Sequence, residues 1–131
     1  MNKKLKIIIT VIVIIIAIVL LILFYLTRGL QEGQNIEVNN VDLSYLEDDG
    51  FYTGNFKFGR WSNEAKVTLE DRKIMDIEFT DDVSFSKDEV REEIINRIID
   101  KQKVNVDVVS GATVTSKAYM KAVEDALDIL H

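Results

Sequence analysis

The chain has 131 residues, enough for one modest domain and a membrane anchor, and it contains no cysteine, which excludes disulfides, thiolate nucleophiles and iron–sulfur clusters. Its single histidine, His131, excludes multi-histidine metal sites and histidine-based catalytic triads. Residues 31–131 hold all 22 acidic residues and twelve of the 16 basic ones, a formal net charge of −10, which argues against a nucleic-acid partner because phosphate backbones bind basic surfaces.

The first element in the chain is an apolar run that predicts a membrane anchor. The stretch Ile7–Leu26 matches the ~20 apolar residues needed to cross a bilayer core. Basic residues lie mainly before this run, which predicts a cytoplasmic N-terminus and an extracytoplasmic remainder. A cleaved signal peptide is the alternative, but no small-residue cleavage pattern follows the run.

These observations divide the chain into three parts. We expect a transmembrane signal-anchor over residues 1–28, a flexible tether over residues 29–41 and an extracytoplasmic domain over residues 42–131. The tether is rich in Gly, Gln and Asn and has little periodic apolar pattern, as is typical of a linker. The expected location is therefore the cell membrane, which the chain crosses once.

Three short strands are predicted in the first half of the domain. They cover residues 51–58, 65–69 and 74–79. The second strand alternates apolar and polar side chains, and the third places Ile77 and Phe79 on one face. Successive short strands with tight connections indicate an antiparallel meander.

Two amphipathic helices are predicted after the strands. Apolar residues recur at helical spacing from Val90 to Ile99, and Ser86 with Glu89 forms a capping-box pattern before them. Arg97 is interpreted as a cation near the end of this helix, where the helix dipole favours it. The last helix is expected from Ser116 to Leu130 with one apolar stripe. The predicted fold class is α+β, a small antiparallel sheet of three or more strands packed against two or more helices and preceded by one transmembrane helix.

Residues 107–116, which read Asp-Val-Val-Ser-Gly-Ala-Thr-Val-Thr-Ser, join a small-residue loop to the start of the last helix. Unpaired backbone N–H groups and the positive end of the helix dipole make a helix start suitable for a phosphate group. Gly111 and Ala112 let a ligand come close to the backbone. The alternative is an ordinary helix start, with Thr115 or Ser116 as the N-cap and Asp107 as a turn residue.

The chain resembles the small FMN-binding domain found in flavinylated subunits of the sodium-translocating NADH:quinone reductase and related redox complexes. The resemblance covers about residues 42–131 and rests on Asp49–Gly54, on the strands around Val67 and Ile77, and above all on residues 107–113. This last segment matches the family's flavinylation sequence of an acid, two variable positions, Ser or Thr, Gly, Ala and Thr.

The chain departs from the family before the third strand. The family usually has Gly in that connection, and this chain has Asp71-Arg72-Lys73. Asp adopts a left-handed backbone more readily than most residues, so we expect the hairpin to be kept with a different turn.

The resemblance implies that FMN is attached to Thr113 through a phosphodiester bond and that a separate flavin transferase installs it. Ser110, Gly111 and Ala112 would form the loop that the transferase reaches, and Asp107, the acid of the motif, would orient the loop or the threonine hydroxyl.

Each of the neighbouring residues has two possible roles. Thr115 and Ser116 either donate hydroxyls to the phosphate or cap the helix. Lys117 either offsets the phosphate charge or is a solvated lysine. Trp61 and Tyr52 either stack on the flavin ring or pack within the fold.

The implied function is that of a membrane-tethered electron carrier, which passes electrons from a membrane quinone or reductase to an outer acceptor. No general acid–base pair is evident, so we assign no catalytic residues, and we assign no metal ligands either; a carrier is expected rather than a stand-alone enzyme. One alternative is a non-redox binding or sensing module of the same fold, with FMN held loosely or absent. Another is a flavin-dependent reductase that acts on a soluble substrate.

Overall fold

The computed structural model describes residues 2–128. The chain forms two compact units, which meet in the sequence between Gln31 and Glu32. Leu130, where the last helix was expected to end, and His131 lie outside the described residues.

The first unit contains the helix α1, Lys3–Thr27, in which no residue is buried. The hydroxyl groups of Thr10 and Thr27 donate hydrogen bonds to backbone carbonyls four residues earlier. The polar groups of these threonines are thus satisfied within the helix, as a hydrocarbon environment requires. The helix is long and apolar enough to cross a membrane, in agreement with the prediction.

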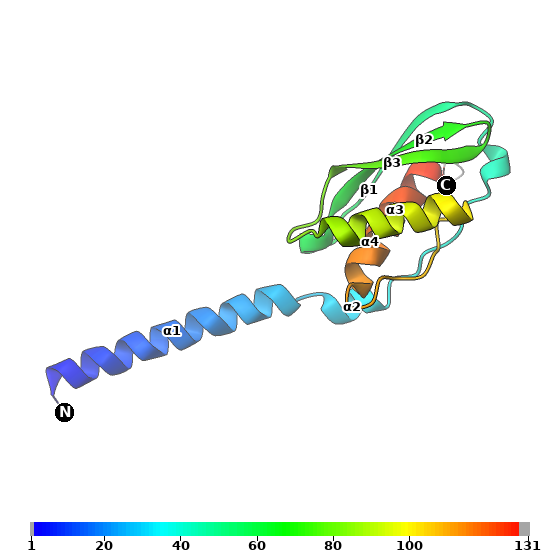
Figure 1. Ribbon diagram of the computed structural model, residues 1–131. Coiled ribbons are helices and arrows are strands. Elements are labelled where there is room, and N and C mark those ends of the chain that lie inside the picture. Colours follow the sequence, from blue (N-terminus) through cyan, green and yellow to red (C-terminus); the bar gives the residue numbers. More distant parts are fainter. Residues whose placement is uncertain (1, 129–131) are drawn as a thin grey trace. The chain divides into compact units, whose positions relative to one another are not determined.

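The second unit is built on an antiparallel sheet of three strands in the order β1-β2-β3, as expected. The strands are β1 Gly50–Phe56, β2 Asn63–Glu70 and β3 Lys73–Asp81 (Figure 1). Along β2, buried and more exposed side chains alternate strictly. In β3, both Ile74 and Ile77 are buried, although they are three residues apart, because the ladder between β2 and β3 shifts register there.

Two long helices, α3 Asp88–Lys101 and α4 Thr113–Leu127, cover one face of this sheet. α4 packs on β1 and β2, and α3 packs on β3 and on α4 (Figure 1). The core between the layers contains Val67 from the sheet, Ile94 and Ile98 from α3, and Val123 from α4, all nearly free of solvent contact. The predicted α+β class is therefore confirmed.

Gly54 allows α4 to lie directly on β1. A Cβ atom added at Gly54 would come within 2.1 Å of the Ala126 nitrogen and 2.5 Å of the Ala122 carbonyl oxygen. Both of these neighbours are backbone atoms, so no rotamer change could make room. The glycine in the middle of this strand is thus a packing requirement of the helix–sheet interface.

The turn between β2 and β3 keeps the hairpin without glycine, as the sequence indicated. Asp71 and Arg72 have φ angles of 53° and 60°, the left-handed pair typical of a type I′ turn. The Asp49 carboxylate accepts a hydrogen bond of 2.8 Å from the Asp71 N–H. This bond ties the turn to the chain before β1.

The predicted capping of α3 by Ser86 is wrong. α3 has Lys87 at its N-cap position, and no side chain caps the helix there. The chain reverses at Phe85, where φ is 58°, so it enters the helix later than the capping-box pattern suggests. At the other end, the Gln102 side chain bonds the backbone N–H and carbonyl of Ile74 at 2.7 and 2.9 Å, which joins the end of α3 to β3.

Residues 29–41, expected as a flexible tether, contain a short helix and make contacts with the domain. This helix, α2, spans Leu30–Gln34. Gly33 is buried against the Val114 side chain, and Val38 is buried in the core. The Asn40 side chain accepts a hydrogen bond of 2.9 Å from the Asn105 N–H. The compact unit therefore begins at Glu32, before the 3-10 turn η1 at Leu43–Tyr45.

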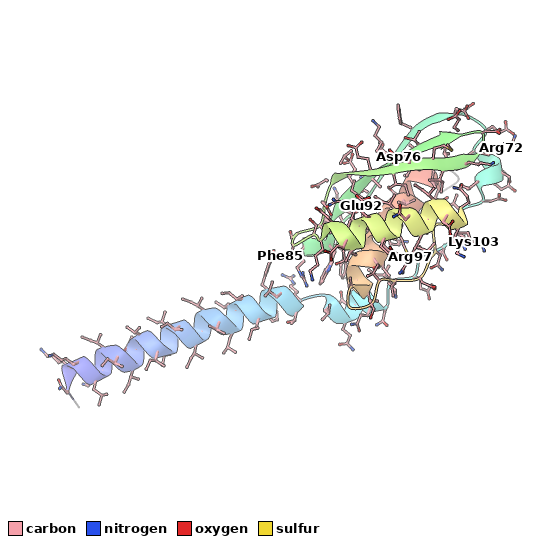
Figure 2. The ribbon with its side chains drawn as sticks, viewed as in Figure 1. Arg72, Asp76, Phe85, Glu92, Arg97 and Lys103 are labelled. Carbon is pink, nitrogen blue, oxygen red and sulfur yellow. The ribbon has the colours of Figure 1, made fainter. Side chains whose placement is uncertain are left out.

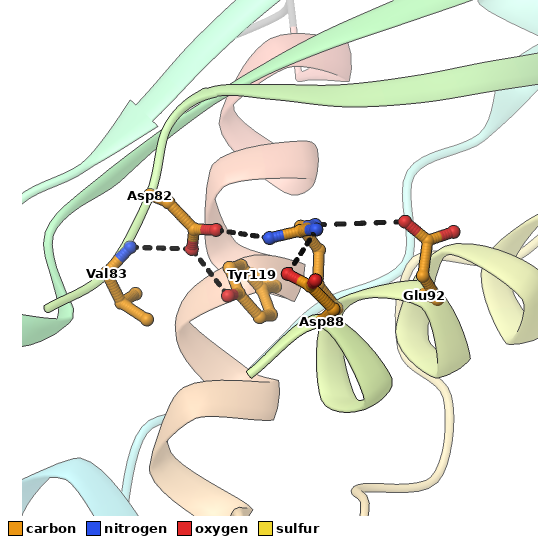
Figure 3. Close-up of polar contacts among 6 residues, drawn as sticks. Asp82, Val83, Asp88, Glu92 and Tyr119 are labelled. Atoms are coloured by element: carbon orange, nitrogen blue, oxygen red, sulfur yellow. Dashed lines mark hydrogen bonds and ion pairs between the residues drawn. The ribbon is translucent and has the colours of Figure 1, made fainter. Parts of the chain in front are cut away.

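A polar network joins the end of β3 to both long helices (Figure 3). The Tyr119 hydroxyl, on α4, donates a hydrogen bond to the Asp82 carboxylate, which also accepts one from the Val83 N–H. Arg91, at the start of α3, pairs with Asp82 at 2.8 Å and with Asp88 at 2.7 Å. The network therefore links the two helices that cover the sheet.

Replacing Tyr119 with Phe should destabilise the fold by about 1.5–3 kcal/mol at neutral pH, since a buried hydrogen bond to a charged group is lost. Burial first, and then the bond to Asp82, raises the pKa of Tyr119 above that of a free tyrosine. Above pH ~10, the ordinary pKa of tyrosine, the unfolded chain has lost this proton while the folded chain still holds it. Wild-type stability should therefore fall above pH ~10. Urea denaturation should show that the gap in unfolding free energy between the wild type and Tyr119→Phe shrinks as the pH rises. A gap independent of pH would contradict this assignment.

Candidate functional site

The loop before α4 contains a tight turn that needs a glycine. The Ala112 N–H donates a hydrogen bond of 2.9 Å to the Val109 carbonyl, which closes a four-residue turn. Gly111, the third residue of this turn, has a φ angle of 80°, as a type II turn requires. A Cβ atom at Gly111 would meet nothing within 4 Å, so the turn is open on this side.

Ser116 fastens this turn to the helix. Its hydroxyl donates a hydrogen bond of 2.6 Å to the Ala112 carbonyl and accepts one of 3.0 Å from the Val109 N–H. The residue is fully buried. The Ser116 hydroxyl is therefore occupied within the loop.

α4 begins at Thr113, three residues earlier than the sequence suggested, with Ala112 at the N-cap position and no side-chain cap. Within residues 2–128, the backbone N–H groups of residues 113–115 have no hydrogen-bond partner. The half-buried Thr113 hydroxyl has none there either. Three free donors at the positive end of a 15-residue helix, beside an open turn, form a suitable place for a phosphate group.

Arg97 on α3 holds the segment that leads into the turn (Figure 2). Its guanidinium donates hydrogen bonds of 2.9 and 3.1 Å to the backbone carbonyls of Asp107 and Val108, and it pairs with Glu93 at 2.9 Å. The sequence analysis treated Arg97 only as a helix-end cation. No local pattern reveals a contact between a helix and a loop ten residues later.

The predicted site residues differ in exposure. Asp107, Ser110 and Gly111 are exposed, and Ala112 and Thr115 are half-buried. The Asp107 carboxylate makes no hydrogen bond or ion pair with the part of the chain that the structure describes. Asp107 was expected to orient the loop or the Thr113 hydroxyl, and its carboxylate is not hydrogen-bonded to either within residues 2–128.

Lys117 is held beside the site by the last residue of α2. Its ammonium group donates a hydrogen bond of 2.6 Å to the Gln34 carbonyl. Lys117 follows Thr113 by one helical turn, so the two side chains share a face of α4. Lys117 is therefore neither a freely solvated lysine nor far from Thr113.

The two aromatic candidates for flavin stacking have partners within the fold. Trp61 is only 3% exposed and lies against the Phe58 ring and the Arg60 guanidinium. The Tyr52 hydroxyl donates a hydrogen bond of 2.7 Å to the Asp48 carbonyl. Packing within the fold accounts for both side chains.

No group of three or more metal-ligating side chains occurs among the described residues 2–128.

Comparison with known proteins adds two findings to this geometry. Residues 59–128 match the model of the FMN-binding domain, which takes in β2, β3, both long helices and the turn before α4. The chain is also 36% identical over 100 residues to an NADH:acrylate oxidoreductase from Vibrio harveyi. This match covers 71% of the chain and 9% of the relative, so the chain spans about a tenth of that protein's length.

Proposed function

The chain belongs to the FMN-binding domain family, and we propose that it is a membrane-anchored electron carrier whose FMN is joined to Thr113 through a phosphodiester bond. The observation that carries this proposal is the position of Thr113. It is the first residue of α4, and its hydroxyl, without a partner among the described residues, lies next to three free backbone N–H groups. The residues at this helix start fit the phosphate of FMN in charge and in space.

Each residue of the loop has a role in this proposal. The Thr113 oxygen forms the bond to phosphorus and gives up its proton. At the same phosphorus, the bond to the leaving group of the flavin nucleotide used by the transferase breaks. The N–H groups of residues 113–115 receive the remaining phosphate oxygens, with the Thr115 hydroxyl close by. Gly111 and Ala112 leave room for the nucleotide, and Ser116 holds their turn in place.

The exposed side of the loop supports attachment by a separate flavin transferase. Ser110 and Gly111 are exposed at the turn, and the Asp107 carboxylate is exposed just before it. An enzyme can therefore reach the threonine from outside the domain. In this proposal the transferase recognises the Asp107 carboxylate, since this group makes no hydrogen bond or ion pair within the described part of the chain.

FMN supplies the oxidation and reduction, and the chain supplies the location of the flavin.

The segment between α1 and the domain is short in sequence, which supports redox partners that lie in or next to the membrane. In the sequence, only residues 28–31 separate the end of α1 from the second unit. Three lysines before the apolar run support a cytoplasmic N-terminus and an extracytoplasmic flavin.

The intact mass of the protein purified from its native membrane tests the proposal. We expect a mass that exceeds that of the polypeptide by one FMN less one water, and a fluorescent band after denaturing electrophoresis. A mass equal to that of the polypeptide alone would overturn the covalent link and favour a module that binds FMN reversibly. Peptide mapping should place the added mass on the peptide that contains Thr113.

Replacing Arg97 with Met should slow flavinylation about tenfold, because two charge-assisted hydrogen bonds that hold residues 107 and 108 are lost. The measurement is the initial rate of in-gel flavin fluorescence with a purified transferase. Lys101→Met, in the last turn of the same helix, is the matched control and should keep the wild-type rate. Equal rates for the two variants, with equal melting temperatures, would show that Arg97 does not position the loop.

A further inference from the structure

A groove of about 310 Å³ lies along α4 close to Thr113. One wall is the segment 36–39, the other is formed by residues 105, 106 and 108, and α4 contributes Lys117 and Met120. The lining combines apolar side chains with two amides, those of Asn39 and Asn105, and with one charge of each sign, the Glu37 carboxylate and the Lys117 ammonium group. The groove thus offers apolar side chains together with polar groups that can fix the orientation of a small molecule.

The groove lies on the side of α4 that carries Thr113. Thr113, Lys117 and Met120 follow the spacing i, i+4, i+7, which places them on one face of a helix. With a rise of 1.5 Å per residue, Lys117 lies about 6 Å and Met120 about 10 Å along the axis from Thr113. Both residues would therefore lie within reach of a flavin attached at Thr113.

We propose that this groove holds the isoalloxazine ring of the FMN attached to Thr113, an inference that rests on the proposed function. The apolar side chains of Ile36, Val106 and Val108 contact the faces of the ring. The Asn105 amide matches its polar edge, which presents two carbonyl oxygens and one N–H. The amide of Asn39 adds its oxygen, since its nitrogen donates a hydrogen bond of 3.5 Å to the Glu124 carboxylate. Residues 36–39, a few residues after the membrane helix, thereby become part of the cofactor site.

Two other hollows of the described surface fit the isoalloxazine ring less well, because acidic side chains line them. A smaller cavity of about 190 Å³, farther along α4, is lined by the carboxylates of Asp42, Glu124 and Asp128. A groove between β3 and α3 is lined by Asp76, Glu78 and Glu92. Each of these hollows is lined by three carboxylates, whereas the groove along α4 is lined by one, that of Glu37, together with the Lys117 ammonium group. Several acidic groups around an electron-accepting ring would oppose the negative charge that reduction adds.

An aromatic cluster near the start of β2 is the main competitor. Phe85 is 71% exposed in the loop between β3 and α3, and the Arg60 guanidinium lies 6.0 Å from its ring and 4.1 Å from the Trp61 ring (Figure 2). The residue after this cluster, Asn63, meets α4 at the Ala118 carbonyl. Ala118 is five residues from Thr113, about 140° around the helix, so the cluster lies off the face that carries the flavin.

Tryptophan quenching of flavin fluorescence distinguishes these two places. Flavinylated full-length chain in detergent would be compared with Ile36→Trp and Val106→Trp, on opposite walls of the groove, and with Phe85→Trp as the matched aromatic control. A tryptophan in contact with the ring quenches it by donating an electron to the excited flavin. We expect several-fold weaker emission for both groove variants and wild-type emission for Phe85→Trp. Quenching by Phe85→Trp alone, or by none of the three, would overturn the groove assignment.

Fluorescence anisotropy decay provides a second readout in the wild-type chain. A ring held in the groove should rotate with the whole protein, whereas a ring that is only tethered by the ribityl chain should show a fast decay. Intact mass separates the two proposals, because an unmodified chain would contradict attachment at Thr113. A modified chain with a freely rotating ring would contradict only the groove.

Discussion

Replacing Thr113 with Val should abolish covalent flavin attachment and leave the fold intact. Val matches Thr closely in shape but lacks the oxygen that bonds phosphorus. The lost hydroxyl has no hydrogen-bond partner among the described residues, so the stability should change by less than about 1 kcal/mol. Co-production with a flavin transferase, followed by intact-mass analysis and denaturing electrophoresis, measures the result directly.

Thr115→Val is the matched control for this experiment. Thr115 lies in the same first turn of α4 and is also half-buried, so its replacement alters the same helix start by the same chemistry. We expect full flavin attachment to Thr115→Val and none to Thr113→Val. Attachment to Thr113→Val would place the flavin on another hydroxyl of the loop, and loss in both variants would point to a general disturbance of the turn.

The strands of the domain follow closely from the sequence because their signals are local. Alternation along Ala65–Leu69 sets the buried face of β2, and the same rule places Ile77 in β3. The left-handed turn at Asp71 also follows from residue chemistry. The start of α3 does not, since the chain reverses at Phe85 next to Ser84, whose N–H bonds the distant Arg60 carbonyl at 2.8 Å.

The sequence singles out the loop of the candidate site but not the residues that hold this loop in place. Residues 107–116 identify the loop, yet the residues that hold it come from elsewhere in the chain. Arg97 reaches the loop from α3, and the Gln34 carbonyl fixes Lys117 across 83 positions. The alternation of Ile36 and Val38 with polar neighbours was a signal that residues 36–39 contact the domain. The surrounding Gly, Gln and Asn residues, typical of a linker, obscured it.

Replacing Gly54 with Ala should cost at least about 3 kcal/mol of folding free energy, the upper end of ordinary overpacking. The new Cβ atom would lie 2.1 Å from the Ala126 nitrogen and 2.6 Å from its Cα atom, so β1 and α4 must move apart as whole elements. A domain of this size has only about 5–15 kcal/mol to lose. Urea denaturation followed by the fluorescence of the buried Trp61 measures the change.

Gly59→Ala provides the matched control, because a Cβ atom there meets nothing within 4 Å and only the φ angle of 53° opposes it. That strain costs roughly 1–2 kcal/mol. Equal stability of the two variants would contradict the direct contact of β1 with α4. If Gly54→Ala moves α4 away from the sheet, it also displaces Thr113 relative to residues 107 and 108, which Arg97 holds from α3. Flavinylation should then fall in Gly54→Ala and persist in Gly59→Ala, which ties the packing of the sheet to the position of the cofactor.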